Sequence, residues 1–245
     1  LRGHPTSAGP AKTKRVVILG MGDTGVLVAS RLSRDFQVTG ISTKPNLVSG
    51  QELGKRLADL DWWQRFYNTP LHRFKALSSV EIRHAKATSV DLDNQTVTVL
   101  DQSKLETRIP YDFLIIASGT SNGFWRDDSL RSGADIDAQL QSDARAISEA
   151  RSIAIVGGGP CGVSSALNIQ RAYPDKTVSL FISADLPLPG YHASARQYYH
   201  QELIKVGVRL FTGHRAITPA PAPRAGTIHF ESGQSAIADT IIWST

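Results

Sequence analysis

The 245-residue sequence contains only one cysteine, Cys161. A single cysteine excludes an intrachain disulfide, a Cys-x-x-Cys redox pair and a cysteine-rich zinc site. The seven histidines show no metal-ligand spacing, so we expect no metal site. We expect Cys161 to serve as a small residue in a tight turn. The alternative is a redox nucleophile, because the start of a helix stabilises a thiolate.

Long apolar runs are also absent. The longest, such as Phe113–Ala117, fall far short of the roughly 18 residues that a membrane-spanning helix needs. The chain has 27 Lys and Arg against 22 Asp and Glu, and the excess of positive charge is scattered. This pattern does not indicate a nucleic-acid partner. We expect a cytoplasmic protein, and the sequence leaves peripheral contact with a membrane open.

Neither end of the chain has the pattern of a complete folded domain. Residues 1–14 are rich in Gly, Pro, Ser and Lys and have no apolar core suited to a secretory signal, so we expect a flexible tail. A transit peptide is the alternative, because this segment has no acidic residue. The last residues, 241–245, are typical of a buried strand with no following turn. We therefore expect a C-terminally truncated chain.

Two segments of the chain repeat one local design. An apolar run at Arg15–Leu19 leads into Gly20-Met21-Gly22-Asp23-Thr24-Gly25, and a second at Ile153–Val156 leads into Gly157-Gly158-Gly159-Pro160-Cys161-Gly162. Each run predicts a strand, a glycine turn and a helix, followed by another strand at Phe36–Ile41 or Thr177–Ile182. With 41% hydrophobic residues, the chain is long enough for two such domains.

In a dinucleotide-binding site, each glycine of the G-x-G-x-x-G spacing has a specific structural role. The first permits a tight turn, the second lets the backbone approach a pyrophosphate, and the third lets helix pack against strand. Free amide groups at the start of the helix then bind the phosphates. One such motif is weak evidence, but two copies, each between a predicted strand and a predicted helix, indicate two dinucleotide-binding units.

The region between the two glycine turns has a β pattern. The alternation of polar and apolar residues predicts an antiparallel meander at Val80–Asp91, Thr96–Leu100 and Glu106–Tyr111, followed by a buried strand at Phe113–Ala117. Helices are predicted near 134–150 and 193–206. The fold class is therefore α/β, with two Rossmann-like dinucleotide-binding domains and an antiparallel β-meander. We place the tail at 1–14, the first domain at 15–133 and the second at 134–245.

An acidic residue at the tip of the second strand, which would bind ribose hydroxyls, is missing from both units. The first unit offers Ser42, Thr43 and Lys44 at this place, and the second offers Ser183. No arginine adjoins Ser183. The sequence therefore predicts neither a strict NADH preference nor a strict NADPH preference.

The stretch Tyr111-Asp112-Phe113-Leu114-Ile115-Ile116-Ala117-Ser118-Gly119-Thr120 between two glycine fingerprints resembles the "YDxLxxATG" segment of the FAD-dependent pyridine nucleotide–disulfide oxidoreductase superfamily. Asp239–Thr245 resembles the family's "DxVIWATG", ending before its glycine. Without a redox disulfide, the chain is most similar to the type II NADH dehydrogenases and the apoptosis-inducing-factor-like and ferroptosis-suppressor-like quinone reductases. The resemblance covers residues 14–245.

This resemblance implies an FAD-dependent oxidoreductase in which NADH or NADPH passes a hydride to the flavin and a separate small molecule, such as a quinone, accepts the electrons. It implies no catalytic acid or base. The residues that it implies for FAD are Gly20, Gly22, Thr24, Gly25, Ser42, Lys44, Ala87, Ala117, Ser118 and Gly119. Those that it implies for the nicotinamide nucleotide are Gly157, Gly159, Pro160, Gly162 and Ser183.

Two residues depart from the family pattern. Asp23 places a carboxylate beside the expected FAD pyrophosphate, and we expect it to stabilise the start of the helix while pointing away from the phosphates. Ser164 stands where many relatives carry a glutamate near the nicotinamide. This second departure keeps an alternative open, a protein that binds FAD or NAD(P)H and senses nucleotides without turnover.

Two further segments have alternative interpretations. Gly119–Gly123 matches the G-x-S-x-G elbow of serine hydrolases, but Phe124–Asp128 shows no helical pattern behind its serine, Ser121. We expect Trp62 and Trp63 to anchor a helix on the core, with a lid near the flavin as the alternative.

Overall fold

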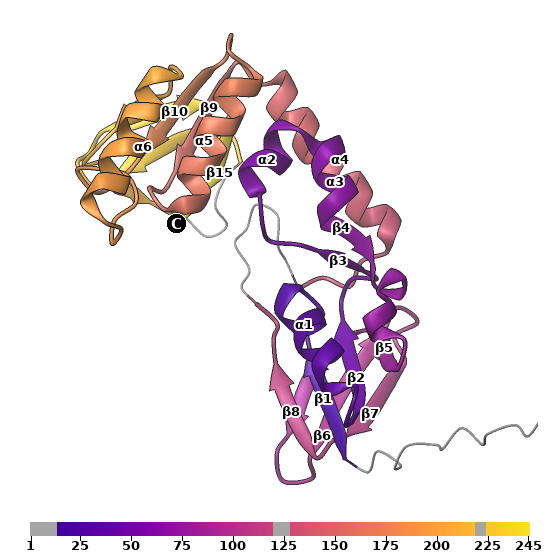
Figure 1. The fold of residues 1–245 in the computed structure, drawn as a ribbon. Helices are drawn as coiled ribbons and strands as arrows, with labels where there is room; N and C mark the ends of the chain where they lie inside the picture. Colours follow the sequence, from indigo (N-terminus) through magenta and orange to yellow (C-terminus); the bar gives the residue numbers. More distant parts are fainter. Residues whose placement is uncertain (1–13, 120–127, 219–223) are drawn as a thin grey trace, which may run out of the picture. The chain divides into compact units, whose positions relative to one another are not determined.

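The computed structural model describes residues 14–119, 128–218 and 224–245 (Figure 1). Their contacts divide the chain into two compact units. Unit 1 contains residues 14–49, 69–119 and 128–133, and unit 2 contains residues 50–68 and the described part of 134–245. Except for Lys14, the expected tail lies outside the described residues.

Unit 1 is built on a sheet of six strands in the order β7-β6-β5-β2-β1-β8. Its elements are β1 (Arg15–Leu19), α1 (Asp23–Leu32), β2 (Gln37–Ser42), β3 (Asn46–Val48), β4 (Asn68–Pro70), β5 (Val80–Asp91), β6 (Thr96–Asp101), β7 (Glu106–Pro110) and β8 (Phe113–Ile116), with short 3-10 turns at Leu71–Arg73 and Lys75–Leu77. The strands β5, β2, β1 and β8 are parallel, and β5-β6-β7 form the predicted antiparallel meander.

The strand β5 belongs to both parts of this sheet. Its first residues pair in parallel with β2, and from Ala85 onward it pairs in antiparallel with β6. The register shifts between Ala87 and Ser89, which is the irregularity of a β-bulge. Because side chains alternate along a strand, Val16 and Ile18 pack in the core on the α1 side while Val17 packs in the core of the meander.

Unit 2 repeats this plan with a parallel sheet in the order β11-β10-β9-β15. Its elements are α2 (Leu53–Ala58), α3 (Leu60–Tyr67), α4 (Gly133–Glu149), β9 (Ser152–Val156), α5 (Pro160–Ala172), β10 (Thr177–Phe181), α6 (Ala193–Lys205), β11 (Arg209–Phe211), β12 (Ala216–Ile217), β13 (Gly226–Phe230), β14 (Ser235–Ala238) and β15 (Thr240–Trp243). The strands β12-β13-β14 form a second antiparallel meander, which the sequence did not predict. The doubly repeated α/β architecture confirms the predicted fold class.

The helices α2 and α3 lie between unit 1 strands in the sequence but pack in unit 2. Leu53 and Leu57 of α2 join the core cluster of α5 and β9. Trp63 is fully buried, and its indole N–H donates to the Gln51 carbonyl at 3.1 Å, so the expected anchoring role is confirmed for Trp63. Trp62 is 39% exposed. The division of function between an FAD-binding domain at 15–133 and a nicotinamide-binding domain at 134–245 stays a prediction.

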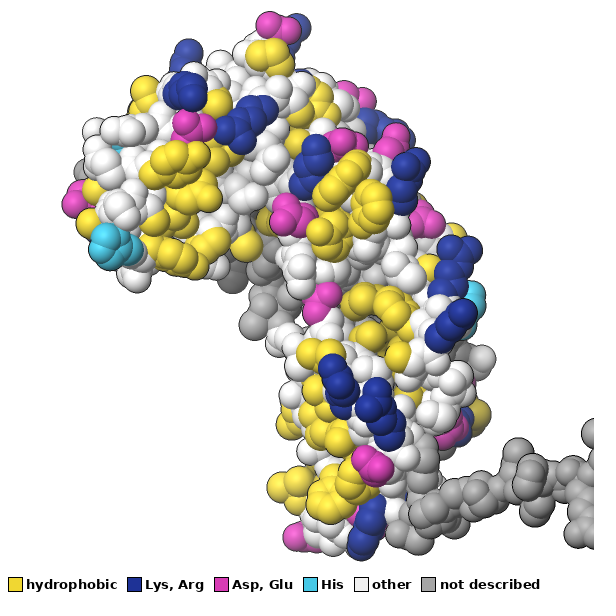
Figure 2. All heavy atoms as spheres, in the orientation of Figure 1, with side chains coloured by type: hydrophobic (Ala, Val, Ile, Leu, Met, Phe, Trp, Pro, Cys, Tyr) yellow, Lys and Arg dark blue, Asp and Glu magenta, His cyan; other side chains and the backbone are white. Residues whose placement is uncertain are grey.

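The surface of the described residues carries mixed charge. On the face shown in Figure 2, Lys and Arg side chains lie among Asp and Glu side chains on each unit. No helix within 14–119, 128–218 and 224–245 is long and apolar enough to cross a bilayer. In the same residues no group of three or more His, Cys, Asp or Glu is placed to bind a metal ion.

Candidate dinucleotide-binding sites

The glycines of the first fingerprint are required by close backbone contacts. Gly20 has φ +98°, and a Cβ there would lie 2.5 Å from the Ala117 carbonyl oxygen. A Cβ on Gly25 would collide with the carbonyl oxygen of Gly20 and would meet Ile18 at 3.7 Å. The first glycine therefore makes the turn against β8, and the third lets α1 lie against β1.

The middle glycine of this fingerprint has the opposite environment. A Cβ on Gly22 would have no atom within 4 Å, so the backbone borders open space here. Gly22 is the N-cap of α1 in extended conformation, and it supplies no side-chain acceptor to the amides of the first turn. Thr24 and Gly25 lie in this turn. We call the open space beside Gly22 and the first turn of α1 a cradle, and a side chain at position 22 would fill it. These residues therefore fit the pyrophosphate of FAD.

The second fingerprint reproduces this geometry residue by residue. Gly157 has φ +124°, and a Cβ there would collide with the Ser244 carbonyl oxygen at the end of β15. A Cβ on Gly162 would collide with the Gly157 carbonyl oxygen, whereas one on Gly159 would meet nothing within 4 Å. Pro160, the first residue of α5, has the fixed φ that a helix start needs. These residues fit the pyrophosphate of a nicotinamide dinucleotide.

An aspartate holds the start of the first strand in each unit. Oδ2 of Asp112 accepts the Arg15 backbone N–H at 2.6 Å, and its pKa is lowered by this bond and by the Arg15 side chain. Oδ2 of Asp239 accepts the amides of Ser152 and Arg151 at 2.8 and 2.9 Å. These bonds and the Ser152 hydroxyl lower the pKa of Asp239. Each aspartate thereby fixes the strand that ends in a glycine turn.

The predicted adenosine end of unit 1 follows β2. The Ser42 hydroxyl donates to the Lys44 carbonyl at 2.7 Å, so it closes a local turn. Lys86 Nζ lies 2.7 Å from Asp128, a carboxylate that the sequence analysis did not select. Ala87 sits at the bulge that follows. The structure thus places polar groups and one exposed ion pair beyond the carboxyl ends of β2 and the parallel part of β5, where ligands of such sheets bind.

The remaining residues selected for FAD follow β8. The Ala117 amide donates to the Leu19 carbonyl at 2.8 Å, which holds Ala117 and Ser118 beside the Gly20 turn. Gly119 has φ +70°. Asp23 is the first residue of α1, as expected for an acidic side chain at a helix start. Ser121, the nucleophile of the alternative hydrolase, lies outside the described residues.

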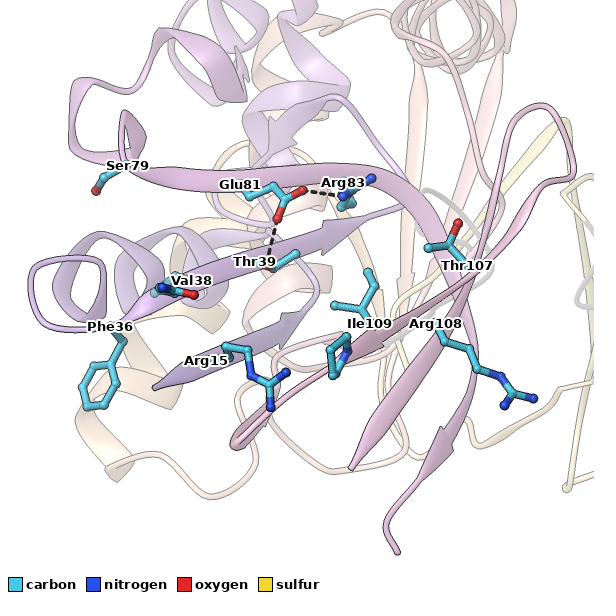
Figure 3. Close-up of a pocket in the computed structure, with 12 residues that line it drawn as sticks. Arg15, Phe36, Val38, Thr39, Ser79, Glu81, Arg83, Thr107, Arg108 and Ile109 are labelled. Atoms are coloured by element: carbon cyan, nitrogen blue, oxygen red, sulfur yellow. Dashed lines mark hydrogen bonds and ion pairs between the residues drawn. The ribbon is translucent and has the colours of Figure 1, made fainter. Parts of the chain in front are cut away.

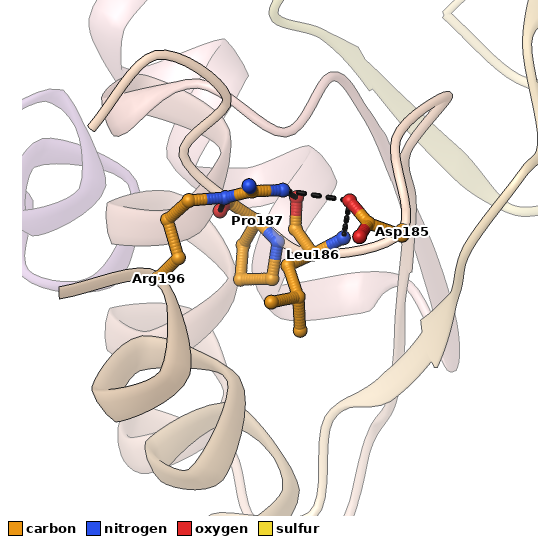
Figure 4. A network of polar contacts seen from close by, with 4 residues as sticks. All are labelled: Asp185, Leu186, Pro187 and Arg196. Carbon is orange, nitrogen blue, oxygen red and sulfur yellow. Dashed lines mark hydrogen bonds and ion pairs between the residues drawn. The ribbon is translucent and has the colours of Figure 1, made fainter. Parts of the chain in front are cut away.

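The predicted adenosine end of unit 2 contains an acid that the sequence analysis missed. Ser183 is exposed at the tip of β10, as expected, and Asp185 follows two residues later. Arg196 of α6 donates to the Asp185 carboxylate at 2.7 Å (Figure 4). The usual spacing between the glycines and the acidic residue leads to Ser183, so Asp185 lies beyond the position that the pattern indicates. The ion pair depends on the loop returning toward α6, which no local pattern indicates.

Ser164, the departure from the family pattern, is covered by α2. A Cβ on Gly54 would lie 2.5 Å from the Ser164 carbonyl oxygen and 2.6 Å from its hydroxyl oxygen. The side-chain amide of Asn168 donates to the Ser164 carbonyl at 2.9 Å. A longer side chain at position 164 would therefore meet α2. Cys161, one turn earlier, is exposed and free.

A hollow of about 390 Å³ in unit 1 lies at the wrong edge of the sheet for a dinucleotide (Figure 3). Its walls include Arg15, Val38 and Glu81, which stand at or near the amino ends of β1, β2 and β5. Ligands of parallel sheets bind beyond the carboxyl ends. In this hollow, Glu81 accepts the Thr39 hydroxyl and pairs with Arg83, and Arg15 pairs with Asp112 at 3.2 Å.

Comparison with known proteins agrees with this geometry. Human ferroptosis suppressor protein 1 is 32% identical over 138 residues, which are 54% of this chain and 35% of that protein. Apoptosis-inducing factor homolog A of Dictyostelium discoideum is 26% identical over 169 residues, 68% of this chain and 39% of that protein. NDH2 of Plasmodium falciparum, solved in complex with NADH, superposes with a TM-score of 0.72 at 16% identity, covering 95% of this chain and 55% of that structure.

These matches confirm the branch that the sequence indicated. The chain spans between 35% and 52% of the length of the curated relatives of ferroptosis suppressor type that it matches. FAD and NADH or NADPH are the cofactors typical of the family. Residues 14–245 match the family described as pyridine nucleotide-disulphide oxidoreductase. With both glycine cradles in place, the chain belongs to the pyridine nucleotide-disulphide oxidoreductase family.

Proposed function

We propose that this chain forms the dinucleotide-binding part of an FAD-dependent NAD(P)H oxidoreductase that reduces a quinone. The observation that carries the proposal is the pair of cradles in which Gly22 and Gly159 border open space while their neighbouring glycines are closely packed. Similarity to ferroptosis suppressor protein 1 supports a quinone as the acceptor. A lipid-soluble acceptor would bring the protein to a membrane surface, so peripheral membrane contact is part of the proposal.

In this proposal each unit binds one cofactor. The first turn of α1 binds the FAD pyrophosphate, the segment from Ser42 to Lys44 and Ala87 border its adenosine, and 117–119 borders the flavin. The first turn of α5 binds the pyrophosphate of NADH or NADPH, and Ser183 lies at its adenosine end. Bound in these two cradles, the cofactors would supply hydride chemistry, with a net transfer of two electrons and two protons from NADH or NADPH and solvent to a quinone. In this proposal the residues of the chain bind and orient the cofactors, and we assign none of them as a general acid or base.

The matched substitutions Gly22→Val and Gly159→Val test this assignment. Both side chains would enter open space, so we expect both variants to fold. Gly22→Val should lose the flavin absorbance of the purified protein, because the side chain blocks the pyrophosphate. Gly159→Val should retain the flavin but lose NADH binding, measured by calorimetry. Stoichiometric FAD in Gly22→Val, or unchanged NADH affinity in Gly159→Val, would remove the corresponding assignment.

A second candidate function is nucleotide binding without turnover. The contact between Gly54 and Ser164 favours it, because this contact fills the place where relatives carry a glutamate. Reduction of the bound flavin by NADH under anaerobic conditions distinguishes the two candidates. Bleaching of the flavin absorbance followed by reoxidation with a water-soluble quinone supports the oxidoreductase. Binding of both cofactors without bleaching supports the sensor.

A further inference from the structure

The helix α3 of unit 2 exposes two aromatic side chains that do not belong to its core contacts. Leu60 and Trp63 of this helix are buried, whereas Trp62 and Phe66 are 39% and 57% exposed. Residues four apart lie on one face of a helix, and the ring centroids of Trp62 and Phe66 are 5.2 Å apart. We call these two side chains the aromatic face. The core of unit 2 is filled without them.

Contacts at the start of α3 and with α4 hold this face in place. The carboxylate of Asp59, the N-cap of α3, accepts the Trp62 amide at 3.1 Å. On α4, Oδ1 of Asp137 accepts the side-chain amides of Gln64 at 3.4 Å and Asn68 at 3.2 Å. The rings are thus presented on a fixed support, so their insertion into a partner requires little further ordering of the chain.

Charged side chains surround the aromatic face with no excess of either sign. Lys55 of α2 places Nζ 5.3 Å from the centroid of the Trp62 ring and 3.4 Å from the Asp59 carboxylate. On α3, the acid Asp61 and the base Arg65 are four residues apart. Figure 2 shows hydrophobic side chains gathered over α2 and α3, with Lys and Arg side chains beside them. These surroundings fit a partner that carries both charges.

The size of the aromatic face favours a lipid surface over a protein partner. Among the described residues of α2 and α3, no other large apolar side chain is exposed. A large aromatic side chain has about 150–250 Å² of surface, so the two rings offer roughly 200 Å² at their exposed fractions. A stable protein interface needs about 800 Å² from each partner. At a bilayer interface, by contrast, aromatic rings insert individually beside the headgroups.

The chemistry of a phosphatidylcholine headgroup matches the charges around this face. The headgroup combines a phosphate anion with a quaternary ammonium cation, and aromatic rings bind quaternary ammonium groups. The Lys55 ammonium group beside Trp62 shows that this ring accepts a cation. We propose that the aromatic face docks unit 2 on a zwitterionic lipid bilayer, with Trp62 and Phe66 inserted at the interface. The choice of a bilayer rests in part on the lipid-soluble acceptor of the proposed function.

Vesicles of brominated phosphatidylcholine test the insertion of Trp62, because bromine on the acyl chains quenches only the tryptophans that enter the bilayer. Trp63 and Trp243 are buried in the protein. The fluorescence of the full chain should therefore be quenched, and Trp62→Phe should lose this quenching. Because Trp62→Phe keeps an aromatic ring, its affinity for vesicles should stay within about threefold of wild type. Raising the salt concentration should change binding little, since the surrounding charges balance.

Truncation of each ring measures its contribution to docking. Trp62→Ala and Phe66→Ala should each lower the partition coefficient onto unlabelled phosphatidylcholine vesicles about tenfold. Tyr198→Ala is the matched control, since Tyr198 is also 57% exposed and lies on α6 of the same unit. It should leave the partition coefficient unchanged. Both truncated side chains are exposed, so we expect the variants to fold, and Trp62→Phe decides if an alanine variant does not.

Several results would overturn the inference. These are a wild-type chain that is not quenched, quenching that persists in Trp62→Phe, and a loss in Tyr198→Ala as large as that in Phe66→Ala. A dimer in sedimentation velocity that Trp62→Ala abolishes would assign the face to a second copy of the chain instead. Vesicle binding needs no cofactor, so it decides this inference separately. A chain that docks but does not reduce a water-soluble quinone would contradict the proposed function and leave the docking surface standing.

Discussion

The two units share a plan of parallel strands, a glycine turn and a meander, but they cover their fourth strand differently. In unit 2, all four residues of β15 are buried. In unit 1, β8 leaves Phe113 52% and Ile116 70% exposed. Two neighbours cover β15: the Thr240 hydroxyl donates to the Ala146 carbonyl of α4 at 3.2 Å, and Ile241 and Trp243 pack in one cluster with the second meander. In unit 1, Ile115 packs against the cluster on the α1 side and Leu114 against the meander cluster, and both stay only partly buried. The same glycine turn can therefore form beside a strand that is buried, as in unit 2, or beside one that is partly exposed, as in unit 1.

Ion pairs differ between the units in the same sense. In unit 2, Arg56 of α2 lies 3.6 Å from Asp143 of α4, and both side chains are only 4% exposed. Burial raises the pKa of Asp143, while Gln139, Arg56 and Arg224 oppose the shift. In unit 1, the Lys86–Asp128 pair is exposed. Unit 2 thus buries charges and apolar side chains that unit 1 leaves in water.

Removing the cation from each pair should give the largest contrast. Arg56→Met removes one cation from the buried Asp143 carboxylate, which keeps Arg224 at 3.2 Å and the Gln139 amide at 2.8 Å. We therefore expect the free energy of unfolding to fall by about 3 kcal/mol, the lower end of the range for breaking a buried pair. Lys86→Met should cause no measurable loss, because Asp128 is solvated. Chemical denaturation followed by tryptophan fluorescence measures both. Equal effects would contradict the difference in burial.

Truncating one isoleucine in each fourth strand should give the next largest contrast. Ile242 is fully buried, so Ile242→Ala should cost about 2–5 kcal/mol of unfolding free energy through lost contacts and a cavity. Ile116→Ala removes the same atoms from an exposed position and should change it by less than about 0.5 kcal/mol. A loss above 1 kcal/mol for Ile116→Ala, roughly twice the limit for surface sites, would show that β8 is covered in solution.

Hydrogen exchange should separate the units without mutation. The amides of β9, β10 and β15 lie in a buried sheet, so we expect them to exchange about a hundredfold more slowly than those of β8, which is about 2.7 kcal/mol in opening free energy. Mass spectrometry of peptic peptides from the full chain measures this. Equal protection of β8 and β15 would contradict the comparison.

The smallest effect concerns the aspartates that fix the first strand of each unit, where the units should behave alike. Both carboxyls have a lowered pKa, so their stabilisation is complete above the ordinary aspartate pKa of about 3.9 and is lost as the pH falls below it. Asp112→Asn and Asp239→Asn should therefore lower the Tm at pH 7. The gap to wild type should narrow as the pH falls below the ordinary aspartate pKa of about 3.9. Asp35→Asn, in an exposed turn, is the control, and a constant gap across this range would refute the linkage.

The sequence predicted the parts of each unit that depend on local geometry. Both fingerprints were recognisable because only glycine fits against the Ala117 and Ser244 carbonyls. This requirement is visible within the six residues of each G-x-G-x-x-G segment. The first meander was predicted because β5 is long and alternating. The second was missed because β12 has two residues and carries no pattern of its own.

Features that depend on packing between distant segments were not predictable. Nothing in residues 50–68 indicates that α2 joins α5, because their contact requires Gly54 to meet Ser164 from a distant part of the chain. Asp185 was overlooked for a similar reason. Its ion pair depends on Arg196 of α6, which lies near Asp185 only because the loop returns toward that helix.

The path of α2 and α3 has a consequence for how this chain can be divided. Because Leu53 and Leu57 complete the core around α5, a fragment made by one cut near residue 133 would expose that apolar surface to water. The same cut would separate Asp143 from Arg56 and leave an anion buried without it. Neither unit is a continuous stretch of sequence, so the boundary between them is crossed several times rather than once. Modular exchange of either unit with a homologous one would have to transplant residues 50–68 along with the second fingerprint.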